Sequence, residues 1–261
     1  MIVRQPAVAG MFYPGESSEL KSAVLGYLQH ADVITESPKA MIVPHAGYVY
    51  SGPVAASAYR CLEKISHQVS RVVLLGPSHR VPLMGLAVSN ADCFATPLGE
   101  IELDRESIDE ILSLPQVRNL DEAHSMEHSL EVQLPFLQLT LDSFKLVPIV
   151  VGDASPDEVC EVLERLWGGA ETLIVISSDL SHYHDYPAAQ AMDRKTSQAI
   201  EALQPEQIQY DDACGRNPVN GLLKAAQQHG LKVRTVDLRN SGDTAGPRDE
   251  VVGYGAYLFY T

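Results

Sequence analysis

Apolar runs of strand length alternate along this chain with amphipathic segments of helix length. The pattern predicts strands at residues 40–43, 71–75, 145–151, 172–176 and 232–238, each followed by turn-forming residues. It predicts helices at residues 17–31, 54–65, 105–114, 130–137, 156–167, 187–202 and 218–229. Such alternation is typical of a mostly parallel sheet covered by helices on both faces. We therefore predict a three-layer α/β/α fold.

Two segments depart from this alternation. Residues 84–103 have the turn-punctuated pattern of short antiparallel strands. The last ten residues, ending in YLFYT, predict a final strand that is internal or antiparallel. No stretch rich in Pro, Gly or Ser marks a linker, so we expect residues 1–261 to form a single domain.

Composition narrows the classes of function. The 261 residues carry a formal net charge of −15, which excludes a protein that binds nucleic acid through a basic face. It also disfavours binding to an anionic membrane surface. No run approaches the ~20 apolar residues that span a bilayer, and no signal peptide is evident. The 4 cysteines are scattered, which is typical of reduced thiols. We expect a cytoplasmic protein.

Histidines follow three of the predicted strands directly. His45 lies in PHAGYVYSG, His79 lies in GPSHR, and SSDLSHYH carries Asp179 and His182. The carboxyl ends of parallel strands meet at one edge of a sheet, where ligands commonly bind. A single histidine after a strand is ordinarily a turn residue whose ring hydrogen-bonds to the backbone. Three such loops in one chain favour a shared site.

These residue types suit a metal centre. The predicted strand VRTVDL would deliver Asp243 to the same edge if it runs in the same direction. Two imidazoles and one carboxylate, here His45, His79 and Asp243, suit non-haem Fe(II), and zinc with a bound water fits as well. His182, with Asp179 three residues earlier, is then the candidate proton shuttle.

A rival motif lies at residues 124–128, which read His-Ser-Met-Glu-His. This sequence satisfies the H-x-x-E-H pattern of inverted zinc peptidases. The motif falls at the start of a helical pattern instead of inside it, so a surface helix is an alternative. We favour a third interpretation, in which Glu127 and His128 serve the strand-end site, either by supporting its ligands or by binding its substrate. Tyr48, beside His45, and Cys214, in a polar turn, are further candidates for substrate binding.

The whole chain resembles the Memo family (mediator of cell motility) in its bacterial and archaeal branch. The resemblance is carried, in order, by PAVAGMFYPG, PHAGYVYSG, GPSH, ATPLGEIELD, EHSLEVQLPFLQ, SSDLSHY, CGRNP, NSGD and VVGYGAY. That family is similar to the LigB-type class III extradiol dioxygenases, which use non-haem Fe(II) to open catecholic rings. The resemblance implies their α/β fold, a metal at His45 and His79, and an acid/base role for His182.

The third ligand is where this chain departs from its relatives. The animal proteins carry a cysteine, and the dioxygenases a glutamate, in the segment that here reads NSGDT. Asp243 is the nearest carboxylate. The resemblance favours Fe(II), with zinc or copper as alternatives, and implies a redox enzyme acting on a small molecule. It also associates the protein with a radical-SAM enzyme and an AMMECR-type protein. The competing hypotheses are a non-catalytic metal-binding or partner-recognition protein with a vestigial site, and the zinc peptidase.

Overall fold

The computed structural model describes residues 1–261 and contains two sheets. The large sheet has nine strands, in the order β10-β12-β2-β9-β3-β8-β4-β7, with β11 paired to β12. These strands are β2 (Ala40–Val43), β3 (Arg71–Pro77), β4 (Leu86–Val88), β7 (Val117–Asn119), β8 (Lys145–Val151), β9 (Thr172–Ser177), β10 (His182–His184), β11 (Lys232–Asn240) and β12 (Val251–Tyr260). The small sheet joins β1 (Val3–Arg4), β5 (Cys93–Thr96) and β6 (Gly99–Glu102).

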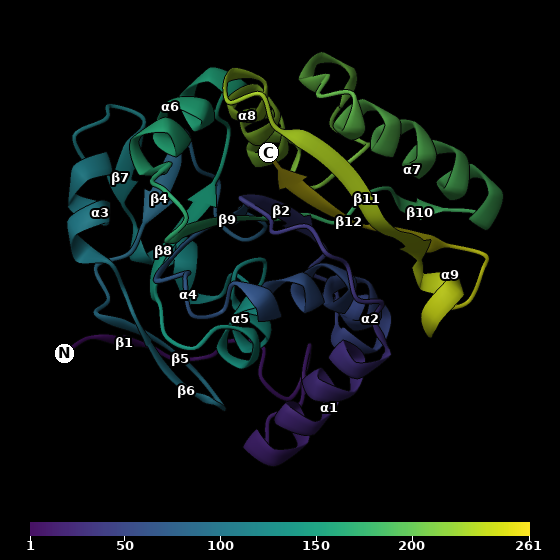
Figure 1. Ribbon diagram of the computed structural model, residues 1–261, viewed down its shortest axis with the longest axis horizontal. Coiled ribbons are helices and arrows are strands. Elements are labelled where there is room, and N and C mark those ends of the chain that lie inside the picture. Colours follow the sequence, from purple (N-terminus) through teal and green to yellow (C-terminus); the bar gives the residue numbers. More distant parts are fainter.

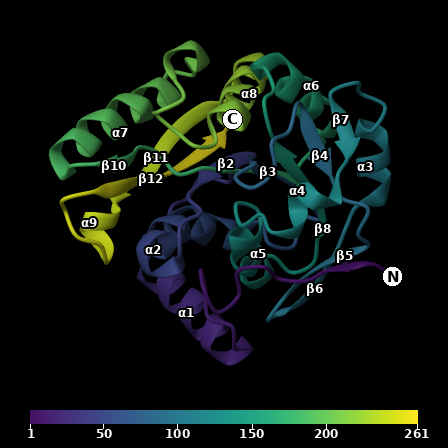
Figure 2. The same cartoon turned by 180° about the vertical axis from the view of Figure 1, so that it is seen from behind.

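Helices cover both faces of the large sheet, as Figures 1 and 2 show from opposite sides. One layer contains α3 (Arg105–Ile111), α6 (Pro156–Leu166), α7 (Tyr186–Glu201) and α8 (Arg216–Gln228). The other contains α1 (Ser17–His30), α2 (Tyr48–Tyr59) and α5 (Leu134–Thr140). Two shorter helices are α4 (Asp121–Ser125) and α9 (Ser241–Thr244), and 3₁₀ turns occupy η1 (Arg60–Lys64), η2 (Glu131–Gln133) and η3 (Pro205–Gln207). The predicted three-layer α/β/α fold is confirmed.

The central strands β2, β9, β3 and β8 run parallel, so their carboxyl ends lie along one edge of the sheet. Strand β9 lies between β2 and β3, although it comes more than ninety residues after them in sequence. Strand β12 is antiparallel to β2, and β11 is antiparallel to β12, so β11 has the direction of β2. Almost every residue of the four central strands is buried, which explains their uninterrupted apolar sequences.

The predicted strands are confirmed within two residues at each end, but some local structure differs. Helix α2 begins at Tyr48 instead of residue 54, because Pro53 lies inside the helix and does not begin it. Strands β5 and β6 form the expected antiparallel hairpin, whereas β4 joins the large sheet beside β8. Helix α4 and strand β10 were not predicted; both are very short.

One hydrophobic cluster of 73 buried residues extends through the layers. It includes the large side chains of Tyr59, Phe94, Phe136 and Phe259, which are almost completely buried. Among the helices, none combines the length and the apolar character that crossing a bilayer would require.

Helix α6 begins with a complete capping box, which gives a prediction about stability. The Ser155 hydroxyl accepts a hydrogen bond from the Glu158 amide at 3.2 Å, and the Glu158 carboxylate accepts one from the Ser155 amide at 2.8 Å. Ser155→Ala removes the acceptor for one helix-end amide, so we expect a loss of about 1 kcal/mol in the free energy of unfolding. Urea denaturation measures it, and Ser125→Ala, at the exposed end of α4, is the control.

Candidate metal centre

Two histidines reach the carboxyl edge of the sheet from strands that flank β9. His45 follows β2 and His79 follows β3, each two residues after the last strand residue. Their imidazole rings meet edge to face with centroids 5.2 Å apart. The sequence prediction that these two histidines lie close together in space is thereby confirmed.

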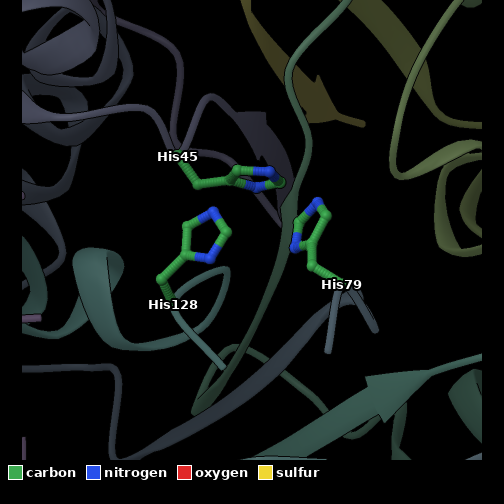
Figure 3. Close-up of side chains that lie close together, drawn as sticks. All are labelled: His45, His79 and His128. Carbon is green, nitrogen blue, oxygen red and sulfur yellow. The ribbon is translucent and has the colours of Figure 1, made fainter. Parts of the chain in front are cut away.

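The third imidazole belongs to His128, which lies in the connection between α4 and η2. Its ring stacks on that of His79 with centroids 4.6 Å apart, and it meets the His45 ring at 5.4 Å. Figure 3 shows the three rings pointing toward one another from three separate segments of the chain. One ring nitrogen from each lies within 4.8 Å of the others, so His45, His79 and His128 form a group that can hold a divalent metal ion.

Hydrogen bonds determine which nitrogen of His45 is free. The Ser177 hydroxyl donates to the Ser129 carbonyl at 2.5 Å and accepts from the Gln133 amide at 2.8 Å. Its remaining lone pair therefore accepts from Nδ1 of His45, at 2.9 Å. Nε2 of His45 then keeps its lone pair, which is the form that binds a metal.

Glu127 arranges the other two histidines. Its carboxylate accepts from the backbone amide and Nδ1 of His79, at 2.6 and 2.8 Å, and from the amides of His128 and Ser129. Burial raises the pKa of Glu127, but the hydrogen bonds that its carboxylate accepts from His79 and Ser129 outweigh this effect and lower the pKa to about 2. An ionised carboxylate only accepts, so His79 carries its proton on Nδ1 and keeps Nε2 free.

Electrostatics favour the neutral, metal-binding form of His45 and His128. Burial, together with the neighbouring His79, lowers the pKa of His128 to about 4. Burial is also the main reason why the pKa of His45 lies well below its ordinary value. Nδ1 of His128 is buried without a hydrogen-bond partner, although Glu127 Oε1 lies 3.4 Å away. Neutral imidazoles are the species that coordinate divalent metals.

The three histidines are among the 22 residues that line a cavity of about 1050 Å³. Asp179 and His182 both line it, as does Cys214. Nδ1 of His182 donates to the Leu180 carbonyl at 2.8 Å, which leaves its Nε2 free. The buried carboxylate of Asp179 accepts from the His45 amide at 2.7 Å, and burial raises its pKa above the ordinary value.

The thiol of Cys214 lies 3.3 Å from Nε2 of His45. Burial, with the nearby Asp179 carboxylate, raises its pKa, so the thiol is protonated at neutral pH. Gly215 permits this position, because a Cβ there would meet the Ser178 side chain at 2.6 Å. The absence of a side chain at Gly215 thus lets this loop approach the end of β9.

Asp243 lies outside the group of three imidazoles. Strand β11 does run in the direction that would bring this segment to the shared edge, but α9 begins there. The Asp243 carboxylate accepts from the Asn240 amide at 3.0 Å in a capping box and from the Tyr186 hydroxyl at 2.5 Å. Within this segment Ser241 and Gly246 line the cavity, and Asp243 does not. The third member of the group that can hold a metal is therefore His128, and not the predicted Asp243.

Two other candidates also lie outside the cavity wall. Tyr48 is buried in the core, where its hydroxyl donates to the Val132 carbonyl at 2.6 Å and its ring packs against Phe136. His124 is in the short helix α4, which ends before His128, and its Nε2 contacts the Ala87 carbonyl. The two histidines of the H-x-x-E-H motif therefore do not share one helix face, and His124 is not in the metal-capable group.

Glu127 provides a test of how the histidines are held. Glu127→Gln replaces an ionised acceptor with a neutral amide, so the tautomer of His79 and the position of His128 are less well fixed. We expect metal affinity to fall by about 10–100-fold. Competition with a chromophoric chelator measures it. Glu122→Gln is the control, because Glu122 is an exposed acid of the same segment. The metal affinity of this variant should match that of the unmodified protein.

Sequence reasoning missed several residues that build this site. Ser177 and Gln133 orient His45, and the cavity wall also includes Tyr183, Tyr210 and Glu250. The one available signal was Ser177 itself, which directly follows the predicted strand at residues 172–176 and precedes Asp179 by two residues. Gln133 belongs to a 3₁₀ turn far from the strand ends in sequence, where no pattern indicates a site.

Comparisons with known proteins agree with this architecture. Residues 4–258 match the family model described as "Memo-like protein". A "MEMO1 family protein" of Aquifex aeolicus is 39% identical, with 99% of this chain and 100% of that protein covered. Another from Ignicoccus hospitalis is 38% identical, with 99% of each chain covered. An uncharacterized Escherichia coli K12 protein, JW3007, shares the fold at a TM-score of 0.52 and 11% identity, over 84% of this chain and 98% of its own. This chain belongs to the Memo family.

Proposed function

We propose that this protein is a metal-dependent enzyme that carries out redox chemistry on a small molecule in the cavity above His45, His79 and His128. The observation that carries the proposal is the convergence of three imidazoles on the wall of a cavity of about 1050 Å³. A cavity of this size suits a small organic substrate. Three protein ligands leave coordination positions open for that substrate.

The donor set fits a divalent metal. Hydrogen bonds to Ser177 and Glu127 fix the protonated nitrogens of His45 and His79, and His128 has a buried nitrogen without a partner. Imidazole ligands suit zinc, copper and iron alike, so they do not select one metal. We favour Fe(II) because of the resemblance to extradiol dioxygenases. A bound metal would supply Lewis acidity and, if it is iron, a redox centre.

The protein supplies a group for proton transfer. Nε2 of His182 is unoccupied by any protein partner, and the ring lines the cavity. Because Nδ1 is held by the Leu180 carbonyl, Nε2 is the atom that would take a proton from a substrate and return it. Asp179 lines the same wall and anchors the backbone at His45. It therefore positions the loop that carries a metal-binding residue.

The experiment is metal analysis of anaerobically purified protein, followed by oxygen-uptake measurements. Protein loaded with Fe(II) should consume oxygen in the presence of an oxidisable small molecule, such as a catechol or an aromatic amine. Zinc-loaded protein is the control and should consume none. Stoichiometric iron without oxygen uptake across such a panel would contradict the redox proposal and favour a non-catalytic metal-binding protein.

A further inference from the structure

The wall of the cavity is biased toward one sign of charge. Its 22 lining residues include three carboxylates, Asp179, Asp211 and Glu250, but no lysine and no arginine. Asp179 lies near the histidines, and a bound metal would offset its charge. Asp211 and Glu250 are exposed, and neither takes part in an ion pair with the protein. They therefore lie where the cavity opens to solvent.

Three arginines lie near the wall residues in sequence, and none of them lines the cavity itself. The guanidinium of Arg216 donates to Asn217 Oδ1 at 3.1 Å and lies 5.8 Å from the centre of the Tyr210 ring. That of Arg248 lies 4.4 Å from the centre of the Tyr186 ring. Arg80 follows His79 but is exposed and does not line the cavity. No lysine or arginine side chain is therefore among the residues that line the cavity, although Arg216 lies against the ring of Tyr210, which does line it.

Aromatic rings line the same opening. Tyr183 is 72% exposed and Tyr210 is 80% exposed, although both contribute to the cavity wall. Tyr183 has a backbone φ of 61°, a conformation that a bulky residue rarely adopts. Residues held in such conformations gather at functional sites. The faces of exposed tyrosine rings attract organic cations.

The charge of the whole chain acts in the same direction. A formal net charge of −15 produces a negative potential that raises the local concentration of cations and repels anions. Among the lining residues, His45 is buried and His128 half-buried, whereas Asp211 and Glu250 are exposed.

We propose that the substrate is a small organic amine, whose ammonium group is recognised by Asp211 and Glu250 and whose body lies along Tyr183 and Tyr210. This inference rests on the proposed function only in taking the cavity above the histidines as the substrate site. The inference adds that the substrate carries a positive charge, a property that the metal centre alone does not determine.

The test compares two probes of similar shape and opposite charge, 2-phenylethylamine and 3-phenylpropionate. Metal-free protein is used, because a carboxylate can bind directly to a metal. Calorimetric titration at low ionic strength should show the amine binding at least about tenfold more tightly than the carboxylate. The preference should shrink at about 0.5 M salt, where the Debye length is only a few ångströms.

The variant Asp211→Asn with Glu250→Gln should remove most of this preference. Its matched control is Asp142→Asn with Glu110→Gln, which changes the net charge equally at exposed positions outside the cavity. Equal or tighter binding of the carboxylate, or equal amine affinity in the two double variants, would overturn the proposal. Zinc titration of the same proteins separates the two inferences. If zinc binds but the amine preference is missing, only the amine proposal fails; if zinc does not bind, the metal-centre proposal fails.

Discussion

The double variant His45→Ala with His79→Ala is expected to lose stoichiometric binding of divalent metal. These residues contribute two of the three convergent imidazoles, and a single remaining histidine offers no chelation. The affinity should fall by far more than the about 100-fold that is typical of losing a supporting residue. His128→Ala alone should also weaken binding severely. Metal content after loading and dialysis, measured by elemental analysis, gives the result.

His124→Ala is the matched control for these variants. His124 lies four residues from His128 in sequence, is buried, and contacts the Ala87 carbonyl instead of the metal-capable group. It should bind metal with the stoichiometry of the unmodified protein. If His124→Ala lost the metal while the double variant kept it, the site would be that of the H-x-x-E-H motif. Circular dichroism of each variant confirms that it is folded.

Glu131→Gln is expected to cause the largest loss of stability of any single substitution considered. The Glu131 side chain is fully buried and accepts four hydrogen bonds, from Arg4 at 2.6 Å, Tyr13 at 2.6 Å, Ala7 at 2.8 Å and Val8 at 3.0 Å. Neutralising it leaves the buried guanidinium of Arg4 without a counter-charge. The free energy of unfolding should fall by about 3–5 kcal/mol, measured by urea denaturation.

Glu102→Gln is the control for that experiment. Glu102 also pairs with a cation, Lys145 at 2.8 Å, but both side chains are more than half exposed. Water screens such a pair, so its loss should leave the free energy of unfolding almost unchanged. Similar effects of the two substitutions would show that the buried pair does not hold the N-terminal segment in place.

The central sheet was predictable because its strands are buried on both faces. Strands β2 and β8 have the boundaries that the apolar runs predict, since burial on both sides demands continuous apolar sequence. Short elements were not predictable. Strand β10, with the sequence His-Tyr-His, forms only because it pairs with β12, and three polar residues carry no strand signal of their own.

The candidate site was predictable as far as it depends on strand ends. His45 and His79 follow strands that flank β9, and a parallel sheet brings such positions together whatever their separation in sequence. His128 could not be placed in this way, because it lies in a connection that is positioned by Glu127 and Arg4. The prediction for Asp243 depended on the direction of a strand, which was right. It overlooked that Asn-Ser-Gly-Asp is also a capping sequence.

The position of β9 between β2 and β3 has a consequence for when a metal can bind. Strands β2 and β3 are held side by side by β9, which lies far along the chain and pairs with both. The loops that carry His45 and His79 therefore come together at the edge of the sheet through this pairing. In the unfolded chain the three imidazoles are separated, so the group that can hold a metal belongs to the folded sheet. A metal ion that binds only the folded protein stabilises it. At a free concentration of 100 times the dissociation constant, the ion would add about 2.7 kcal/mol to the free energy of unfolding.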